Sequence, residues 1–305
     1  MLLFFLPLFI LFLISFPKFN NNYINNFNIT NQKRYINQNY SDVKSVLSLF
    51  IGFIDADGYI RISSQKNLYD KNHINISIVL NLKYSNEDRY MLEYIKEVLN
   101  IGYIYNITPR KGNKIIRFEI SKSDIKTKLY PLLSKYNIKF LTEDRQKQYY
   151  ISKYILDNNI IYYDDINLNK EIIKDYINKN IIKNNFNKYS FFNNWLIGFT
   201  IGNGSFLIKK NGDACYQLKQ KNNYNLLLDI NNYFDFKYIN IFTNRKIYNQ
   251  LTISSVNNIT TIINFFNDSN NNHPLLGSKL TSYNNWLLKL NLNSRYKSIF
   301  KDKKI

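Results

Sequence analysis

Two apolar segments of the chain share one pattern of small and polar positions. From Ser41 or Asp42, either a good helix N-cap, apolar residues at helical spacing predict a helix to Asp57, with Gly58 as a left-handed stop. A second such helix is predicted from residue 191 to Asn203. Each carries small residues four apart, at positions 52 and 56 and at positions 198 and 202. Because such spacing lets helix backbones approach closely, we expect these two helices to pack against each other.

Alternation of polar and apolar residues after each of these helices predicts two hairpins interleaved with helices. In the first copy the predicted strands are 59–63, 75–83, 102–105 and 115–120, and the predicted helices are 86–100, 123–136 and 143–156. In the second copy the strands are 205–209, 215–221, 238–242 and 249–254, and the helices are 224–234, 259–266 and 282–292. We therefore predict an α+β fold of two pseudo-symmetric αββαββα halves, forming a saddle of two antiparallel sheets with the small-residue helices at the interface.

Composition divides the chain into four predicted regions. These are an apolar and then Asn-rich N-terminal region (1–40), a first half (41–157), a linker of marginal helix (158–188) and a second half (189–305). Residues 1–16 are apolar but shorter than the roughly 20 residues of a membrane span. They fit a secretory signal core, a short membrane anchor or the remnant of an upstream reading frame, but not an Arg-rich targeting presequence. Residues 17–40 lack periodicity, so we expect disorder there.

Two carboxylates stand where a helix end should disfavour them. Asp55 and Asp57 lie in the last turn of the first predicted helix, at the negative end of its dipole. A bound cation would remove this unfavourable interaction. The chain has one cysteine, Cys215, and two histidines, His73 and His273, so it lacks a zinc ligand set. The metal expected from these residues is a hard cation with oxygen ligands, which suits Mg²⁺.

The repeated motif carries a resemblance to a known family. Residues 50–59 read FIGFIDADGY and residues 196–205 read LIGFTIGNGS. This resembles the LAGLIDADG homing endonucleases and the related intron maturases, in the single-chain form with two motifs. Asp57 matches the family's metal-binding acid, and the implied metal set is Asp57, Gly202 and Asn203. The second copy departs from the family pattern at Ile201 and Asn203, which puts a second active centre in doubt.

The resemblance also implies a set of catalytic residues. Gln220 matches a strand glutamine that helps order water near the metal, and Lys279 matches a basic residue near the scissile phosphate. In the first half, Tyr84 stands where a glutamine is expected, and Arg145 is the nearest basic candidate. The implied catalytic set is therefore Asp57, Asn203, Gln220, Lys279 and Arg145.

Charge points to a polyanionic partner. The chain has 41 basic and 22 acidic residues, a formal net charge of +19, and a soluble protein this basic usually meets nucleic acid. Strand alternation places polar and basic side chains on the uncovered face of each sheet, where β-ribbons fit the major groove. The candidates are Arg61, Ser63, Asn75, Ser77, Asn81 and Lys83 in the first half, and Lys209, Gln217, Lys219 and Lys221 in the second.

Three functions remain open at this point. The first is a monomeric, Mg²⁺-dependent homing endonuclease, made inside the mitochondrion, that binds double-stranded DNA and nicks it if only one centre is competent. The second is a maturase that binds its host intron RNA. The third is a membrane-tethered structural protein, which rests on membrane contact by residues 1–16.

Overall fold

The computed structural model describes residues 42–66, 72–110, 112–238, 241–244, 247–268 and 272–301. The predictions for residues 1–16 and 17–40 lie outside these ranges. Within them, no helix combines the length and the apolar character that crossing a membrane requires.

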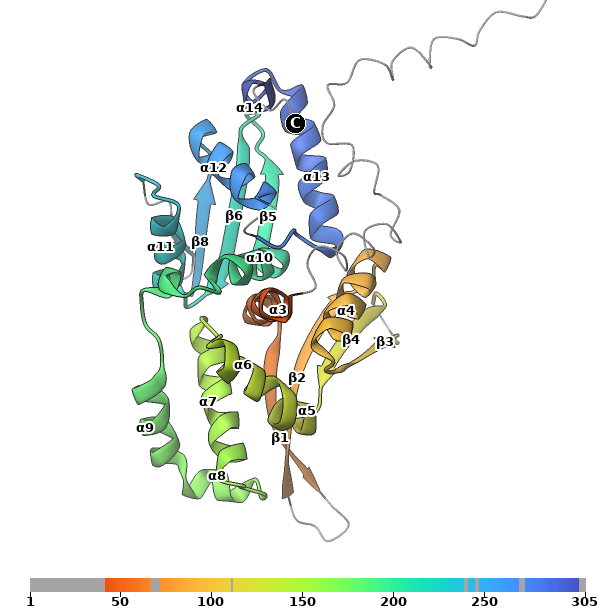
Figure 1. The fold of residues 1–305 in the computed structure, drawn as a ribbon, viewed down its shortest axis with the longest axis vertical. Coiled ribbons are helices and arrows are strands. Elements are labelled where there is room, and N and C mark those ends of the chain that lie inside the picture. The colour runs from red at the N-terminus through yellow and green to blue at the C-terminus, as the bar shows by residue number, and fades with distance from the viewer. Residues whose placement is uncertain are drawn as a thin grey trace, which may run out of the picture.

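Two helices lie side by side at the centre of the molecule, α3 (Val43–Asp57) and α10 (Phe192–Asn203) (Figure 1). A Cβ atom added at Gly52 would lie 1.9 Å from the carbonyl oxygen of Trp195, and one at Gly198 would lie 1.8 Å from that of Leu49. Only glycine leaves room for backbones this close. The predicted packing of the two repeat helices is confirmed.

Local interactions define both ends of α3, but its C-terminal end differs from the prediction. Asp42 is the N-cap, and its Oδ2 accepts from the Ser45 amide at 2.9 Å. Gly58 was predicted to be left-handed, but it is extended, with φ −87°. Its amide still bonds Ile54 O at 2.9 Å, and the chain then continues directly into a strand. A Cβ at Gly58 would lie 2.8 Å from Ile54 Cδ1, so close packing favours the glycine there.

Each half contains one four-stranded antiparallel sheet. The first has the order β1-β2-β4-β3, with β1 Tyr59–Lys66, β2 Asn72–Lys83, β3 Tyr103–Ile107 and β4 Ile115–Ile120. The second has the order β5-β6-β8-β7, with β5 Gly204–Ile208, β6 Ala214–Lys221, β7 Ile241–Asn244 and β8 Tyr248–Ile253. The predicted α+β saddle of two antiparallel sheets is confirmed, although β7 lies farther along the chain than the predicted 238–242.

The helices complete the two halves. The first contains α4 Asn86–Leu99, α5 Lys122–Asp124, a π-helical turn Ile125–Leu129, α6 Tyr130–Tyr136 and α7 Glu143–Asp157. The linker contains α8 Asp164–Leu168, α9 Lys170–Asn180 and a 3₁₀ turn Phe186–Lys188. The second half contains α11 Tyr224–Tyr233, α12 Val256–Asn267, α13 Gly277–Leu292 and α14 Ser298–Lys301.

Two helices differ from their predicted form. The helix predicted over 123–136 contains the π turn, which precedes Pro131, a residue with no amide hydrogen to donate to the helix. The helix predicted over 282–292 begins at Gly277, five residues earlier. Its first turn is Gly-Ser-Lys, which shows no apolar periodicity.

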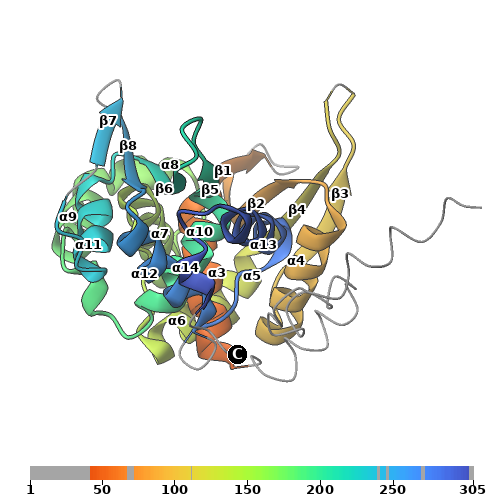
Figure 2. The same ribbon diagram turned by 90° about the horizontal axis from the view of Figure 1, so that it is seen from above.

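Each sheet buries one face, and the other face is partly exposed. Ile76, Ile78 and Leu80 of β2 are fully buried, as are Ile116 and Phe118 of β4. Residues of the opposite parity carry most of the polar side chains, although Ser77 and Val79 at the centre of β2 are also buried. Figure 2 shows the outer ribbons β3–β4 and β7–β8 rising on the same side at the two ends of the molecule, as the walls of a saddle.

Candidate active site and nucleic-acid interface

The C-terminal ends of α3 and α10 bring Asp57, Gly202 and Asn203 together. A Cβ added at Gly202 would lie 2.5 Å from the Cβ of Ala56 and 3.0 Å from Oδ2 of Asp57. The second small-residue position of each repeat therefore brings the two candidate metal-binding positions side by side. This is the place that the repeat predicts for a shared centre.

Gln220 and Lys279 lie at the same junction. Asn203 donates its Nδ2 to Gln220 Oε1 at 2.5 Å, and Gln220 Nε2 donates to the backbone oxygen of Asp55 at 3.4 Å. Lys279 donates its Nζ to the carbonyl oxygen of Gly204, the residue that follows Asn203. Four of the five sequence-predicted catalytic residues thus lie around the ends of the two central helices.

The charges of Asp57 and Lys279 are coupled. Desolvation by neighbouring groups raises the pKa of the Asp57 carboxyl, and the positive charge of Lys279 partly offsets that rise. Burial likewise lowers the pKa of Lys279, while Asp57 and Asp88 oppose the shift. A carboxylate from the first half and an ammonium from the second therefore form one electrostatic unit across the interface.

Arg145 occupies the equivalent place in the first half but has other partners. It is the third residue of α7, as Lys279 is the third residue of α13. Its Nη1 donates to Gln148 Oε1 at 2.8 Å, and the same oxygen accepts from the Ile60 amide at 2.9 Å. Burial lowers the pKa of Arg145, and the charges that oppose this shift are those of Asp55 and Asp144 rather than that of Asp57. Arg145 is therefore directed toward Gln148, a residue that sequence reasoning missed.

The first half has no strand glutamine equivalent to Gln220. Tyr59 and Ser205 are equivalent, because each is the second residue after its central helix. Tyr59 pairs with Val79 and Ser205 pairs with Gln217, so Val79 is the counterpart of Gln217, and Leu82, three residues on, is the counterpart of Gln220. The expectation that Tyr84 fills this place was wrong by two residues. The error arose because counting residues in the sequence does not fix which β2 position faces the start of β1.

Asp55 has a structural role that the helix-dipole argument missed. It is fully buried, and its carboxylate accepts from the Leu141 amide at 2.8 Å, the Thr142 amide at 3.1 Å, Thr142 Oγ1 at 2.5 Å and Trp195 Nε1 at 2.8 Å. Burial raises the pKa of Asp55 to about 6, against the effect of these donors. The carboxylate lies at the N-terminus of α7, where a helix favours negative charge. It is not free to bind a cation.

The described residues contain no group of three His, Cys, Asp or Glu side chains suited to a metal ion. What the junction offers is the carboxylate of Asp57, the amide oxygen of Asn203 and backbone oxygens nearby. This all-oxygen set with one carboxylate fits Mg²⁺ that is also coordinated by phosphate and water.

All ten residues predicted for nucleic-acid contact fall on the same face of their sheets, but Ser77 is buried, with 3% exposed, and accepts from Arg61 Nε at 3.2 Å, so it is not open to direct contact. Paired residues share a face, and the register pairs Arg61 with Ser77, Ser63 with Asn75, and Gln217 with Ser205. Alternation along β2 and β6 places four more residues on these faces: Asn81, Lys83, Lys219 and Lys221. Lys209 continues the second ladder, since its amide bonds Asp213 O at 2.8 Å.

Neighbouring strands add polar and aromatic groups to these faces. Arg61 forms a 2.7 Å ion pair with Glu119, and Arg117 donates to Asn81 Oδ1 at 2.8 Å. The register also places Tyr105 and Phe242 on the same faces of the outer strands, where both are exposed. Sequence reasoning did not select these four residues, because it considered only the inner strands.

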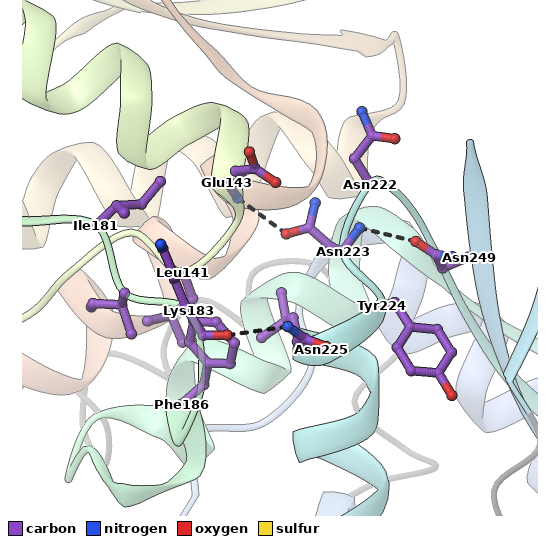
Figure 3. Close-up of a pocket in the computed structure, with 12 residues that line it drawn as sticks. Leu141, Glu143, Ile181, Lys183, Phe186, Asn222, Asn223, Tyr224, Asn225 and Asn249 are labelled. Carbon is purple, nitrogen blue, oxygen red and sulfur yellow. Dashed lines mark hydrogen bonds between the residues drawn. The ribbon is translucent and has the colours of Figure 1, made fainter. Parts of the chain in front are cut away.

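A separate cavity of about 470 Å³ lies between α7, the linker and the start of α11 (Figure 3). The Glu143 amide donates to Asn223 Oδ1 at 3.0 Å, and the Asn223 amide donates to Asn249 Oδ1 at 3.0 Å. None of the predicted site residues lines this cavity. The contact between Glu143 and Asn223 joins the two halves.

Comparison with known proteins now adds to this geometry. The family model described as LAGLIDADG endonuclease matches residues 50–156 and 196–289, which together make up more than half of the chain. The chain belongs to the LAGLIDADG endonuclease family. The two matched segments correspond to the two structural halves, so it has the two-motif, single-chain form of that family.

Two curated relatives are described as probable intron-encoded endonuclease aI3. The one from Kluyveromyces lactis is 31% identical over 264 residues, which cover 78% of this chain and 63% of that protein. The one from Dictyostelium citrinum is 24% identical over 252 residues, which cover 79% of this chain and 94% of that protein. The chain therefore spans less than two thirds of the Kluyveromyces relative.

Solved LAGLIDADG structures share the fold. I-SmaMI bound to cleaved DNA matches with a TM-score of 0.62 and 21% identity, over 84% of this chain and 92% of that one. I-SmaMI bound to an uncleaved DNA target with calcium ions also has a TM-score of 0.62, with 20% identity, over 84% of this chain and 94% of that one. I-CpaMI bound to uncleaved DNA matches with a TM-score of 0.58 and 19% identity, over 84% of this chain and 96% of that one.

Proposed function

We propose that this LAGLIDADG protein is an intron-encoded homing endonuclease that binds a long double-stranded DNA site as a monomer and hydrolyses phosphodiester bonds with Mg²⁺. The observation that carries the proposal is the junction of Asp57, Asn203, Gln220 and Lys279 between two polar sheet faces. The family membership, the intron-encoded relatives and the net charge of +19 support it. As a further part of the proposal, the protein is made inside the mitochondrion as an intron product.

The residues of the junction have separate roles in this proposal. Asp57 holds the divalent ion, with the oxygens of Gly202 and Asn203 beside it; the ion, when bound, activates water and offsets phosphate charge. Gln220 orients water through its amide, which the contact with Asn203 keeps in place. Lys279 neutralises charge on the scissile phosphate without exchanging a proton.

Arg145 and the polar sheet faces complete the assignment. Arg145 serves the phosphate of the other strand from its place beside Gln148. Base edges and phosphates are contacted by Arg61, Ser63, Asn75, Asn81, Lys83, Lys209, Gln217, Lys219 and Lys221, while buried Ser77 holds Arg61 in place. Because these contacts spread over both sheets, binding does not depend on the metal ligand.

The test separates cleavage from binding. Asp57→Asn should lower the cleavage rate by at least about 100-fold, the scale of losing one charge-stabilising group, while the dissociation constant for target DNA stays within about threefold of wild type. Asp175→Asn, an exposed change in α9, is the matched control and should leave both unchanged. Cleavage by Asp57→Asn at the wild-type rate would remove Asp57 from the mechanism.

One observation favours a second candidate, an intron maturase that binds its host intron RNA. Ile201 and Asn203 stand where an active two-site enzyme of the family usually carries acidic residues or, at the first position, a polar one, and Asn203 is hydrogen-bonded to Gln220. Purified protein should be incubated separately with intronless-allele DNA plus Mg²⁺ and with its own intron transcript. Tight transcript binding without DNA cleavage would favour the maturase.

A further inference from the structure

The two inner hairpins, β1–β2 and β5–β6, leave the candidate active site in opposite directions (Figure 1). The first begins at Tyr59, just after α3, and the second at Gly204, just after α10. Position along each hairpin therefore measures distance from Asp57 and Asn203. Counted from the equivalent residues Tyr59 and Ser205, the β1–β2 ladder has eight residue pairs, whereas the β5–β6 ladder has four, to which Lys209 adds a fifth through its bond to Asp213 O.

The shorter hairpin closes at once. The Lys209 amide bonds Asp213 O at 2.8 Å, and the Gly212 amide bonds Lys209 O at 2.9 Å. The segment after α13 braces this turn, since Asn293 Nδ2 donates to Gly212 O at 3.2 Å and Arg295 forms an ion pair with Asp213. The compact turn therefore limits how far the β5–β6 hairpin extends from the candidate active site.

The longer hairpin is braced by the segment after α7. The Ile74 amide bonds Ile161 O at 2.9 Å, and the Tyr163 amide bonds Asn72 O at 2.8 Å. This segment pairs with β2 beyond Ile78, where the described pairing of β2 with β4 ends. The part of the hairpin nearest its tip is therefore held in a three-stranded arrangement.

The added length carries groups suited to base contact. Gln65 pairs with His73, and alternation puts both on the face of Arg61, Ser63 and Asn75. The His73 ring meets the Tyr162 ring edge-to-face at 5.2 Å. Glutamine and histidine can both hydrogen-bond to base edges, and the packed tyrosine orders the histidine.

The difference in length between the two ladders can be expressed in base pairs of DNA. Three additional pairs at about 3.3 Å per residue extend the first ladder by about 10 Å. Base pairs are spaced about 3.4 Å apart along duplex DNA, so the difference corresponds to about three base pairs. We infer that Gln65 and His73 are specificity residues of the first half, which contact the target about three base pairs farther from the cut centre than the second half reaches, so that its two sides are read to unequal distances. This rests on the proposed DNA binding but not on cleavage.

The experiment uses the Asp57→Asn chain, so that the DNA stays intact. Hydroxyl-radical footprinting on the target should show protection extending about three base pairs farther on one side of the cut centre. Gln65→Ala and His73→Ala should each reduce discrimination at the outermost protected base pairs of that side by about tenfold, within the range for losing one base contact. Asn211→Ala, at the tip of the shorter hairpin, is the matched control and should leave those positions unchanged.

The outcomes separate the inference from the function on which it rests. Protection of equal extent on both sides, or discrimination unaffected by either substitution, overturns the asymmetric reading while DNA binding stands. A chain that binds no duplex overturns the proposed function and this inference together.

Discussion

The two halves hold the equivalent helices α7 and α13 in different ways. In the first half, Asp55 of α3 accepts from the amides of Leu141 and Thr142 at the start of α7. In the second half the equivalent of Asp55 is Ile201, which has no acceptor. There Asp88, from α4 of the first half, accepts from the Ser278 amide at 2.8 Å and from Ser278 Oγ at 3.0 Å. The second half thus depends on the first to hold the helix that carries Lys279.

The same contrast separates two roles of the repeated motif. Gly52 and Gly198 both meet backbone atoms of the facing helix, so the packing role is present in both copies. The acids are present only in the first copy, as Asp55 and Asp57. Close packing of α3 against α10 therefore does not require acids in both copies of the motif. The second motif serves as a packing partner, and its contribution to the junction is Asn203.

The largest effect on stability is expected from Asp55→Ile, which gives the first half the residue that the second half has at the equivalent position 201. This would leave the amides of Leu141 and Thr142 and the Trp195 indole N–H buried without an acceptor, at about 1–3 kcal/mol each. We expect the free energy of unfolding to fall by about 4 kcal/mol or more, measured by urea denaturation. Asp42→Ala, which removes an exposed N-cap, is the control and should cost about 1 kcal/mol. Equal losses for the two variants would contradict the anchoring role of Asp55.

A smaller loss is expected from crowding the shared interface by Gly198→Ala. The new methyl group would meet Leu49 O, and overpacking of this kind costs about 1–3 kcal/mol or more. Gly212→Ala is a control for backbone strain alone, because its nearest neighbour would lie 3.9 Å away while its φ is +82°. We expect Gly198→Ala to lower the melting temperature more. The reverse order would argue against close packing of α3 and α10.

These two variants also show how far sequence reasoning reaches. Small residues four apart were enough to predict the helix pair, and period-two alternation was enough to predict the open sheet faces. The role of Asp55 was not predictable, because its donors come from residues 141, 142 and 195, which only the folded chain brings together. Leu82 was missed because strand register decides which β2 residue is the counterpart of Gln220. Gln148 lies three residues after Arg145 on α7, a helical spacing that could have pointed to it.

The free energy of unfolding should depend on pH through His273, which joins the second half to α4 of the first half. Buried His273 pairs its Nε2 with Tyr94 Oη of α4 at 3.0 Å, and its Nδ1 with Pro274 O at 2.8 Å. Burial lowers the pKa of His273 from 6.5 to about 4. The unfolded chain therefore binds this proton more readily, and the stability associated with neutral His273 is lost as the pH falls from about 6.5 toward 4.

The measurement is the difference in unfolding free energy between wild type and His273→Gln. The advantage of wild type should shrink by up to about 3 kcal/mol over that range, at about 1.4 kcal/mol per pKa unit. Taking the difference removes the opposite trend of Asp55, whose raised pKa causes a loss of stability as the pH rises through about 6. A difference that does not change with pH would refute the link to His273.

The central claim is that one competent centre, with Asp57 and Lys279 from different halves, lies between the two halves. The most direct test is single-turnover cleavage of target DNA with the two strands labelled separately, in Mg²⁺. We predict that one strand is cut far faster than the other, and that Asn203→Asp accelerates the slow strand where Ile201 does not obstruct the site. Equal rates for both strands in the natural sequence would contradict this account.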